Sequence, residues 1–218
     1  MVPDAEFRSY YGRPILKEPV WREPDVPLYL VLGGMAGASA AMAAVAAAAG
    51  RPDLARVGAL TAAGGALTSV GALVHDLGRP ERFLNMLRVF KPTSPLSVGS
   101  WILSPFSALA AASAGSALTG LLPSVGALAR GAAGLLGPAM CTYTAVLLAD
   151  TAVPAWHEAY PELPFAFAGS ALTSAAGVAM AATGDGGGPA RRLGLLGAGL
   201  ELAAMTRMDR RLGLVGEP

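Results

Sequence analysis

The sequence predicts an all-α fold, a polytopic transmembrane helix bundle with five to six spans. Of the 218 residues, 53% are hydrophobic and only 14% are charged, whereas soluble domains carry roughly a quarter charged residues. The mean hydropathy is +0.49. Charged residues gather in short stretches, and the long runs between them are apolar on every side rather than along one stripe. Lipid is therefore the expected solvent.

Five segments are long and apolar enough to cross a bilayer, which takes roughly 20 consecutive residues. We expect spans at 26–49, 55–74, 96–122, 125–149 and 163–183. Pro105 and Pro138 lie inside the third and fourth segments, where a kinked membrane helix tolerates them. A sixth segment, 192–205, is short and contains Glu201. It could span where the bilayer thins, or it could be half of a longer unit.

The bundle is expected to cover residues 26–206, between a polar N-terminal segment (1–25) and a polar C-terminal tail (207–218). With six spans, 11 of the 16 Lys and Arg residues fall on the side that holds the N-terminus. The positive-inside rule then favours a cytoplasmic N-terminus. Charges that dock a partner subunit would give the same bias.

Several classes of site are not expected. With a net charge of +1, the chain lacks the excess of basic residues that is typical of nucleic-acid-binding proteins. The single cysteine, Cys141, cannot form an internal disulfide or hold a cluster by itself. His75 and His157 are both expected at the same edge of the bundle, whereas axial haem ligands would face each other inside it. No His, Cys and carboxylate set has a metal-site spacing, so we expect neither haem nor metal bound by this chain.

Polar motifs gather on one side of the bundle. Alternation of the spans places four of them on the side of the N-terminus, at 10–21, 75–83, 91–101 and 150–157. The loops on the other side contain no comparable polar motif. This asymmetry suggests a docking surface with a site beneath it, although an aromatic and basic interfacial belt would look similar.

Four ionisable residues are candidates for proton handling. His75 and Asp76 end the second expected span, Asp150 ends the fourth, and Glu201 lies within the sixth. A carboxylate near the middle of a bilayer costs roughly 2.5–3.5 kcal/mol on insertion scales, so it usually faces a cavity or a partner. Two structural alternatives stay open: Asp76 could pair with Arg79 or Arg82, and Glu201 could pair with Arg207 or Arg211.

A series of short motifs follows the chain in a fixed order. They are Tyr10-Tyr11-Gly12-Arg13-Pro14, Lys17-Glu18-Pro19 with Trp21, and the segments 27–34, 76–86, 91–101 and 143–156. In this order they resemble the NrfD/PsrC (polysulfide reductase membrane subunit) family over about residues 7–170. Several motifs in order are more specific than any one of them.

The resemblance implies a quinone-interacting membrane subunit without haem. It would work beside an iron–sulfur electron-transfer subunit and often a molybdopterin-containing catalytic subunit, in a bacterial cytoplasmic membrane. The Ala, Gly and Arg content suggests a GC-rich bacterial genome, where menaquinone is the expected carrier. Two other classes remain: a structural anchor for a peripheral oxidoreductase without quinone chemistry, and a small-solute transporter. A transporter would predict repeated halves with broken helices, and no internal repeat is clear.

The resemblance also assigns residues. It places a quinone head group near Trp21, Tyr29, His75, Asp76 and Tyr143, with His75 and Asp76 handling protons as a group and with Asp150 and Glu201 as relay carboxylates. The docking residues would be Tyr10, Tyr11, Arg13, Lys17, Arg79, Arg82, Trp156 and His157. One departure is that family members commonly have eight or more spans. This chain is then a short relative, or C-terminal helices are missing from it.

Overall fold

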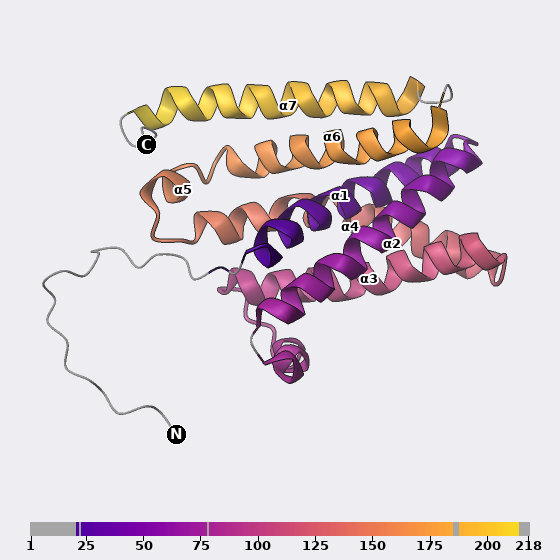
Figure 1. Ribbon diagram of the computed structural model, residues 1–218, viewed down its shortest axis with the longest axis horizontal. Coiled ribbons are helices and arrows are strands. Elements are labelled where there is room, and N and C mark those ends of the chain that lie inside the picture. Colours follow the sequence, from indigo (N-terminus) through magenta and orange to yellow (C-terminus); the bar gives the residue numbers. More distant parts are fainter. Residues whose placement is uncertain (1–20, 22, 78, 185–187, 214–218) are drawn as a thin grey trace, which may run out of the picture.

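The computed structural model of the protein describes residues 21, 23–77, 79–184 and 188–213. In this part of the chain every regular element is a helix (Figure 1). The elements are α1 (Asp25–Ala48), α2 (Pro52–Asp76), the 3-10 helix η1 (Pro80–Leu87), α3 (Pro95–Thr119), α4 (Pro123–Ala149), α5 (Pro154–Glu158), α6 (Leu163–Thr183) and α7 (Gly188–Leu212). The predicted all-α fold is confirmed.

Five of these helices are long and apolar enough to cross a membrane: α1, α2, α3, α4 and α6. They coincide with the five predicted spans to within a few residues, and α6 has the predicted bounds. Proline occupies the first turn of α2, α3, α4 and α6, where its missing N–H costs no helical hydrogen bond. The chain is therefore an integral membrane protein.

Helix α7 is longer than the predicted segment 192–205. Its 25 residues continue to Leu212, so positions 207–212 of the expected tail are helical. It does not count among the five spans because charged residues interrupt its apolar sequence. The helix nevertheless runs antiparallel along α6 (Figure 1). A Cβ on Gly197 would lie 2.8 Å from the Thr173 backbone nitrogen, so the two backbones touch. A sixth span remains a prediction.

Small residues bring the central helices together. A Cβ on Gly137 of α4 would lie 2.5 Å from the carbonyl oxygen of Gly37 on α1. A Cβ on Gly58 of α2 would lie 2.8 Å from the carbonyl oxygen of Ser39. Lipid tails are as apolar as the helix surfaces, so the hydrophobic effect does not drive membrane helices together. Close packing of small residues stabilises the pair through van der Waals contact instead. Helix α1 is therefore held closely against both α2 and α4.

Both short helices lie at one end of the bundle, which we name the η1–α5 end. Figure 1 shows there the start of α1, α3 and α6 and the finish of α2, α4 and α7. The tight turns between α1 and α2, α3 and α4, and α6 and α7 lie at the opposite end. The described parts of the polar motifs at 75–83, 91–101 and 150–157 thus share one end of the molecule.

Candidate functional site

Two polar pairs lie at the η1–α5 end of the bundle. The imidazole Nδ1 of His75, near the end of α2, is 2.7 Å from the Oδ2 of Asp25, the first residue of α1. The hydroxyl of Tyr29 on α1 hydrogen-bonds the hydroxyl of Tyr143 on α4. Asp25 and Tyr29 are four residues apart, which places them on one face of α1. We name these four residues the polar cluster.

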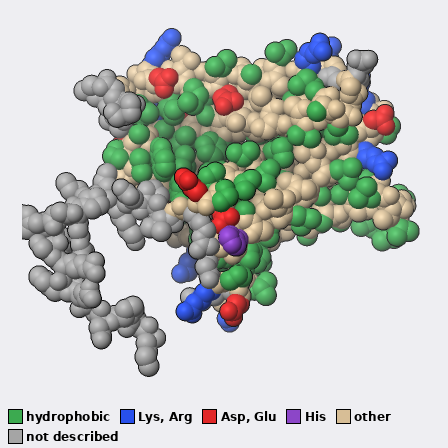
Figure 2. Space-filling model, viewed as in Figure 1, with side chains coloured by type: hydrophobic (Ala, Val, Ile, Leu, Met, Phe, Trp, Pro, Cys, Tyr) green, Lys and Arg blue, Asp and Glu red, His purple; other side chains and the backbone are tan. Residues whose placement is uncertain are grey.

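The Asp25–His75 pair joins a buried carboxylate to an exposed imidazole. The side chain of Asp25 is 12% exposed and that of His75 is 69% exposed. A buried carboxylate is costly unless it is paired, and His75 supplies that partner. If Nδ1–H donates to Asp25, the neutral ring carries its acceptor at Nε2. Figure 2 shows a histidine side chain beside carboxylates on this face of the protein.

The tyrosine pair is buried and tightly packed. The two rings meet edge to face, with centroids 6.3 Å apart and an angle of 71° between their planes. The ring of Tyr143 covers Gly99 of α3, where a Cβ would lie 2.6 Å from the Tyr143 Cε2. The Ser69 hydroxyl of α2 donates to the Tyr29 carbonyl at 3.1 Å. All four helices α1–α4 therefore position this pair.

Trp21 and Trp156 stack, with centroids 5.5 Å apart and planes within 8°. The structure thus joins a residue expected at the head group to one expected in the docking surface. His157, the neighbour of Trp156 on α5, has its Nδ1 3.0 Å from the carbonyl oxygen of Ala149. An imidazole N–H that donates there satisfies an otherwise unpaired carbonyl at the end of α4.

The other three predicted proton-handling residues do not belong to the polar cluster. Asp76 follows His75 directly and is half-buried. Asp150 is exposed just after the last residue of α4. Glu201 packs against Gly169 of α6, where a Cβ on the glycine would lie 2.8 Å from the Glu201 Cβ. The cluster, by contrast, is built by α1, α2 and α4.

The predicted docking residues are only partly described. Arg79 is exposed just before η1, and Arg82 belongs to η1. The remaining four, Tyr10, Tyr11, Arg13 and Lys17, lie outside the described residues.

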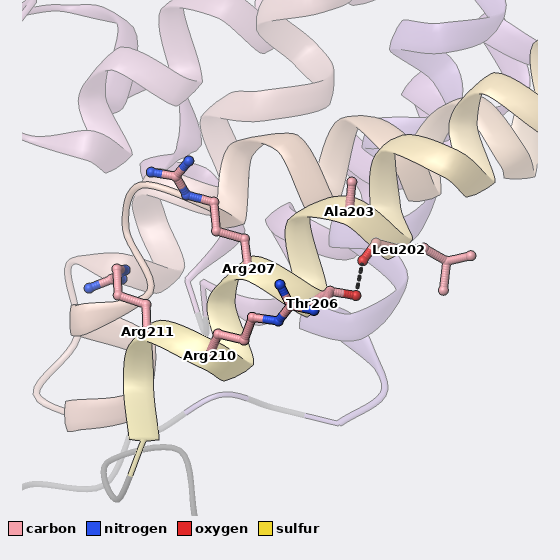
Figure 3. Close-up of a pocket in the computed structure, with 6 residues that line it drawn as sticks. All are labelled: Leu202, Ala203, Thr206, Arg207, Arg210 and Arg211. Carbon is pink, nitrogen blue, oxygen red and sulfur yellow. Dashed lines mark hydrogen bonds between the residues drawn. The ribbon is translucent and has the colours of Figure 1, made fainter.

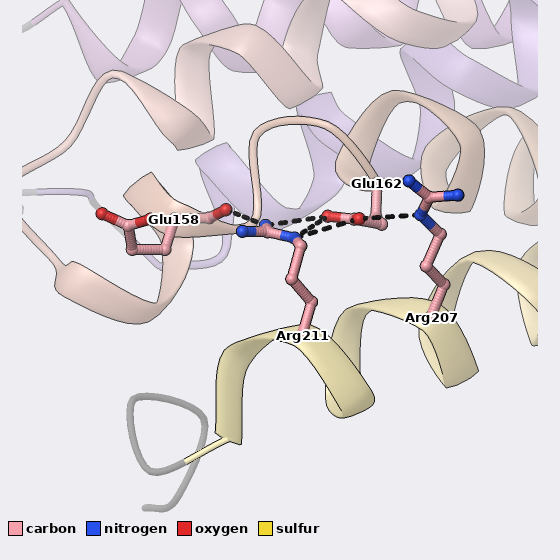
Figure 4. Close-up of polar contacts among 4 residues, drawn as sticks. All are labelled: Glu158, Glu162, Arg207 and Arg211. Carbon is pink, nitrogen blue, oxygen red and sulfur yellow. Dashed lines mark hydrogen bonds and ion pairs between the residues drawn. The ribbon is translucent and has the colours of Figure 1, made fainter.

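The arginines considered as partners of Glu201 bind another carboxylate (Figure 4). Arg207 Nε donates to Glu162 Oε1 at 3.2 Å, and Arg211 Nη2 donates to Glu162 Oε2 at 2.9 Å. Arg211 also donates to the Glu158 carbonyl. The Glu162 side chain is 2% exposed, and the hydrogen bond from Arg211 is the main reason that its pKa lies below the ordinary value. This network fastens the end of α7 to the start of α6.

Sequence reasoning missed Asp25, Gly99 and Glu162. Asp25 was taken as the last residue of a polar segment, although its four-residue spacing from Tyr29 would have indicated a shared helix face. No sequence signal could have found the partners of Glu162, because Arg207 and Arg211 follow it by 45 and 49 residues.

Comparison with known proteins gives one family match. The family model described as polysulphide reductase, NrfD, matches residues 16–184. This range includes the whole polar cluster and the stacked tryptophans. No curated protein and no solved structure matches the chain significantly. Within the described ranges, no group of three or more His, Cys, Asp and Glu side chains is placed to hold a metal ion.

Proposed function

Because the chain belongs to the polysulphide reductase NrfD family and is a membrane subunit of an oxidoreductase complex, we propose that it passes electrons between an iron–sulfur partner subunit and a membrane quinone pool. The observation that carries this proposal is the polar cluster, which brings a carboxylate, an imidazole and two phenols together at the η1–α5 end. Menaquinone in a bacterial cytoplasmic membrane, with a cytoplasmic N-terminus, is the form we propose.

The cluster has the chemistry that a quinone requires. A bound quinone would supply the redox chemistry, taking up or releasing two electrons together with two protons. Its carbonyl oxygens need hydrogen-bond donors, which the tyrosine pair and a protonated imidazole can provide. Leu73, Leu103 and Met140 pack with the two tyrosines in one buried apolar core, so the phenol hydroxyls stand in apolar surroundings.

Each residue of the cluster has a distinct role in this proposal. His75 holds or releases a proton at its imidazole, the side chain that most often serves as a general acid or base. Asp25 orients the imidazole and balances its positive charge. One hydroxyl of the Tyr29–Tyr143 pair donates to the other, and the second is left to donate to the quinone from a fixed position. Asp76 extends the proton-handling group beside His75, and Asp150 and Glu201 remain proposed relay carboxylates.

The partner would dock on the η1–α5 end. Leu84 and the neighbouring Val89 and Phe90 expose large apolar side chains there. Arg79 and Lys91 are exposed on the same connection between α2 and α3. Exposed apolar side chains with charged neighbours are typical of a protein interface. An iron–sulfur subunit on this surface, with a molybdopterin catalytic subunit beyond it, would bring electrons to the end of the bundle that holds the polar cluster.

Purification of the tagged protein in mild detergent tests this proposal. We expect an iron–sulfur protein in the eluate, identified by its visible absorbance, together with extractable quinone. Recovery of the partner without quinone, and without quinone-dependent electron transfer, would instead support a structural anchor. Solute flux into proteoliposomes without any redox partner would support a transporter and reject the proposal.

A further inference from the structure

Helix α7 ends in three arginines beside two adjoining grooves. The first is an open depression of about 620 Å³, lined by Leu202, Ala203, Thr206, Arg207, Arg210 and Arg211 (Figure 3). The second, of about 450 Å³, runs between α6 and α7 and is lined by Pro161, Glu162, Phe165, Leu200, Ala203, Ala204 and Arg207. Ala203 and Arg207 belong to both, so the grooves meet at Arg207.

The arginines leave cationic nitrogens beside the two grooves that are available to bind an anion. Arg207 binds Glu162 through its Nε, and Figure 4 shows its terminal nitrogens directed away from that carboxylate. Its side chain is 78% exposed. Arg210 is exposed and forms no ion pair within the described part of the chain. Asp209 is exposed beside it but does not line either groove.

Apolar side chains continue from the arginines along the helices. Leu202 in the first groove is 68% exposed, and Phe165 is an exposed large side chain in the second. Both grooves lie where α6 begins its span, because Arg207 and Arg211 bind the residue before its first turn. Cationic groups here stand at the level of the membrane surface, and the apolar side chains extend into the bilayer.

We propose that the two grooves bind an anionic phospholipid. The guanidinium groups of Arg207 and Arg210 hold the phosphate of the head group, since their planar N–H forks match phosphate oxygens. The acyl chains lie over Leu202, Ala203 and Phe165. The lipid thereby covers the outer side of the contact between α6 and α7. Cation and apolar surface together distinguish a lipid from free phosphate, which would use the arginines alone.

Native mass spectrometry of the full-length protein, with any subunits that copurify, tests the proposal. We expect wild type to retain phosphatidylglycerol in preference to phosphatidylcholine. The variant Arg210→Gln should lower the affinity for phosphatidylglycerol by about fivefold, the effect of one juxtamembrane charge. Arg192→Gln is the matched control, because Arg192 is exposed near the other end of the same helix and should retain wild-type binding.

Two further measurements separate the possible sources of the phosphate. Leu202→Asn should also weaken phosphatidylglycerol binding, and millimolar inorganic phosphate should fail to displace the lipid. Equal binding by Arg210→Gln and Arg192→Gln would overturn the proposal. Displacement of the lipid by inorganic phosphate would overturn it as well, since the grooves would then be a site for the free anion. All three variants change exposed side chains, and thermal unfolding at the wild-type temperature verifies their folding.

Discussion

Asp25 and His75 are separated by fifty residues in the chain, yet their carboxylate and imidazole lie 2.7 Å apart. The contact joins the first residue of α1 to the last turn of α2. Sequence adjacency suggested Asp76 as an acidic companion of His75, and the structure adds a carboxylate from a different helix. Asp25 therefore joins the residues that we propose for proton handling.

Changing Asp25 to Asn should slow quinone-dependent electron transfer by about tenfold or more, because general acid–base catalysis by a positioned side chain contributes typically 10²–10⁴-fold. The amide keeps the shape of the carboxylate but does not balance an imidazolium. Assembly with the partner subunit and the unfolding temperature should stay near those of wild type, because the amide can keep the contact with the imidazole. A merely structural role for Asp25 would lower the unfolding temperature together with the rate.

Asp150→Asn serves as the comparison for that variant. Asp150 is an exposed carboxylate at the same end of the bundle and lies after the last residue of α4. As a proposed relay carboxylate, Asp150 should also slow the reaction when it becomes Asn, but less than Asp25, because it makes no contact with His75 in the described part of the chain. Equal loss in both variants would show that general surface charge, rather than the contact with His75, controls the reaction.

Replacing Gly99 with Ala should destabilise the protein by about 1–3 kcal/mol, the usual cost of an added methyl group in a packed core. The new Cβ would lie 2.6 Å from the Tyr143 ring, which must move and take its hydroxyl away from Tyr29. Thermal unfolding in detergent measures the loss. Gly115→Ala on the same helix is the matched control, because nothing lies within 4 Å of a Cβ there.

Removing the carboxylate of Glu162 should release α7 from α6. Glu162→Gln leaves Arg207 and Arg211 without their common anion, so the unfolding temperature should fall and protease should cut near the end of α7 sooner. Glu158→Gln is the control, since Glu158 hydrogen-bonds Arg211 through its backbone carbonyl, which the substitution keeps. If both variants unfold like wild type, the network does not hold the two helices together.

Acid should abolish the difference between wild type and Glu162→Gln. The pKa of Glu162 is lowered from the ordinary value of 4.5 in the folded protein. A lowered folded-state pKa stabilises the protein fully above the unfolded-state value, and this contribution is lost as pH falls through the folded-state value. Unfolding temperatures of the two proteins, measured from pH 7 downward, should converge in that acidic range. A gap that persists below it would contradict the ion-pair explanation.

The sequence was sufficient for most of the fold because bilayer solvation depends on composition over a whole helix. Apolar length alone predicted α6 between Leu163 and Thr183. Helix α7 was predicted too short because its charged residues lower the local hydropathy, while the packing of Gly197 against Thr173 that accommodates the helix is a tertiary contact. Hydropathy is calculated for one helix at a time, so it does not detect contacts between a helix and its neighbour.

The site was predicted less completely, for a related reason. Tyr29, Tyr143 and His75 were selected from motifs, and the structure joins the two tyrosines directly. The partner of His75 was not found, since an aspartate at the start of a helix resembles an ordinary polar flank. Pairing across helices depends on rotation about each helix axis, which hydropathy leaves undetermined.

The contact between Gly37 and Gly137 fixes the position of α1 along α4, because backbone touches backbone at this point. Asp25 and Tyr29 both lie on α1, twelve and eight residues before Gly37. Any displacement of α1 would therefore change the distance from Asp25 to His75 and the distance from Tyr29 to Tyr143 at the same time. The two polar pairs are mechanically coupled through one helix.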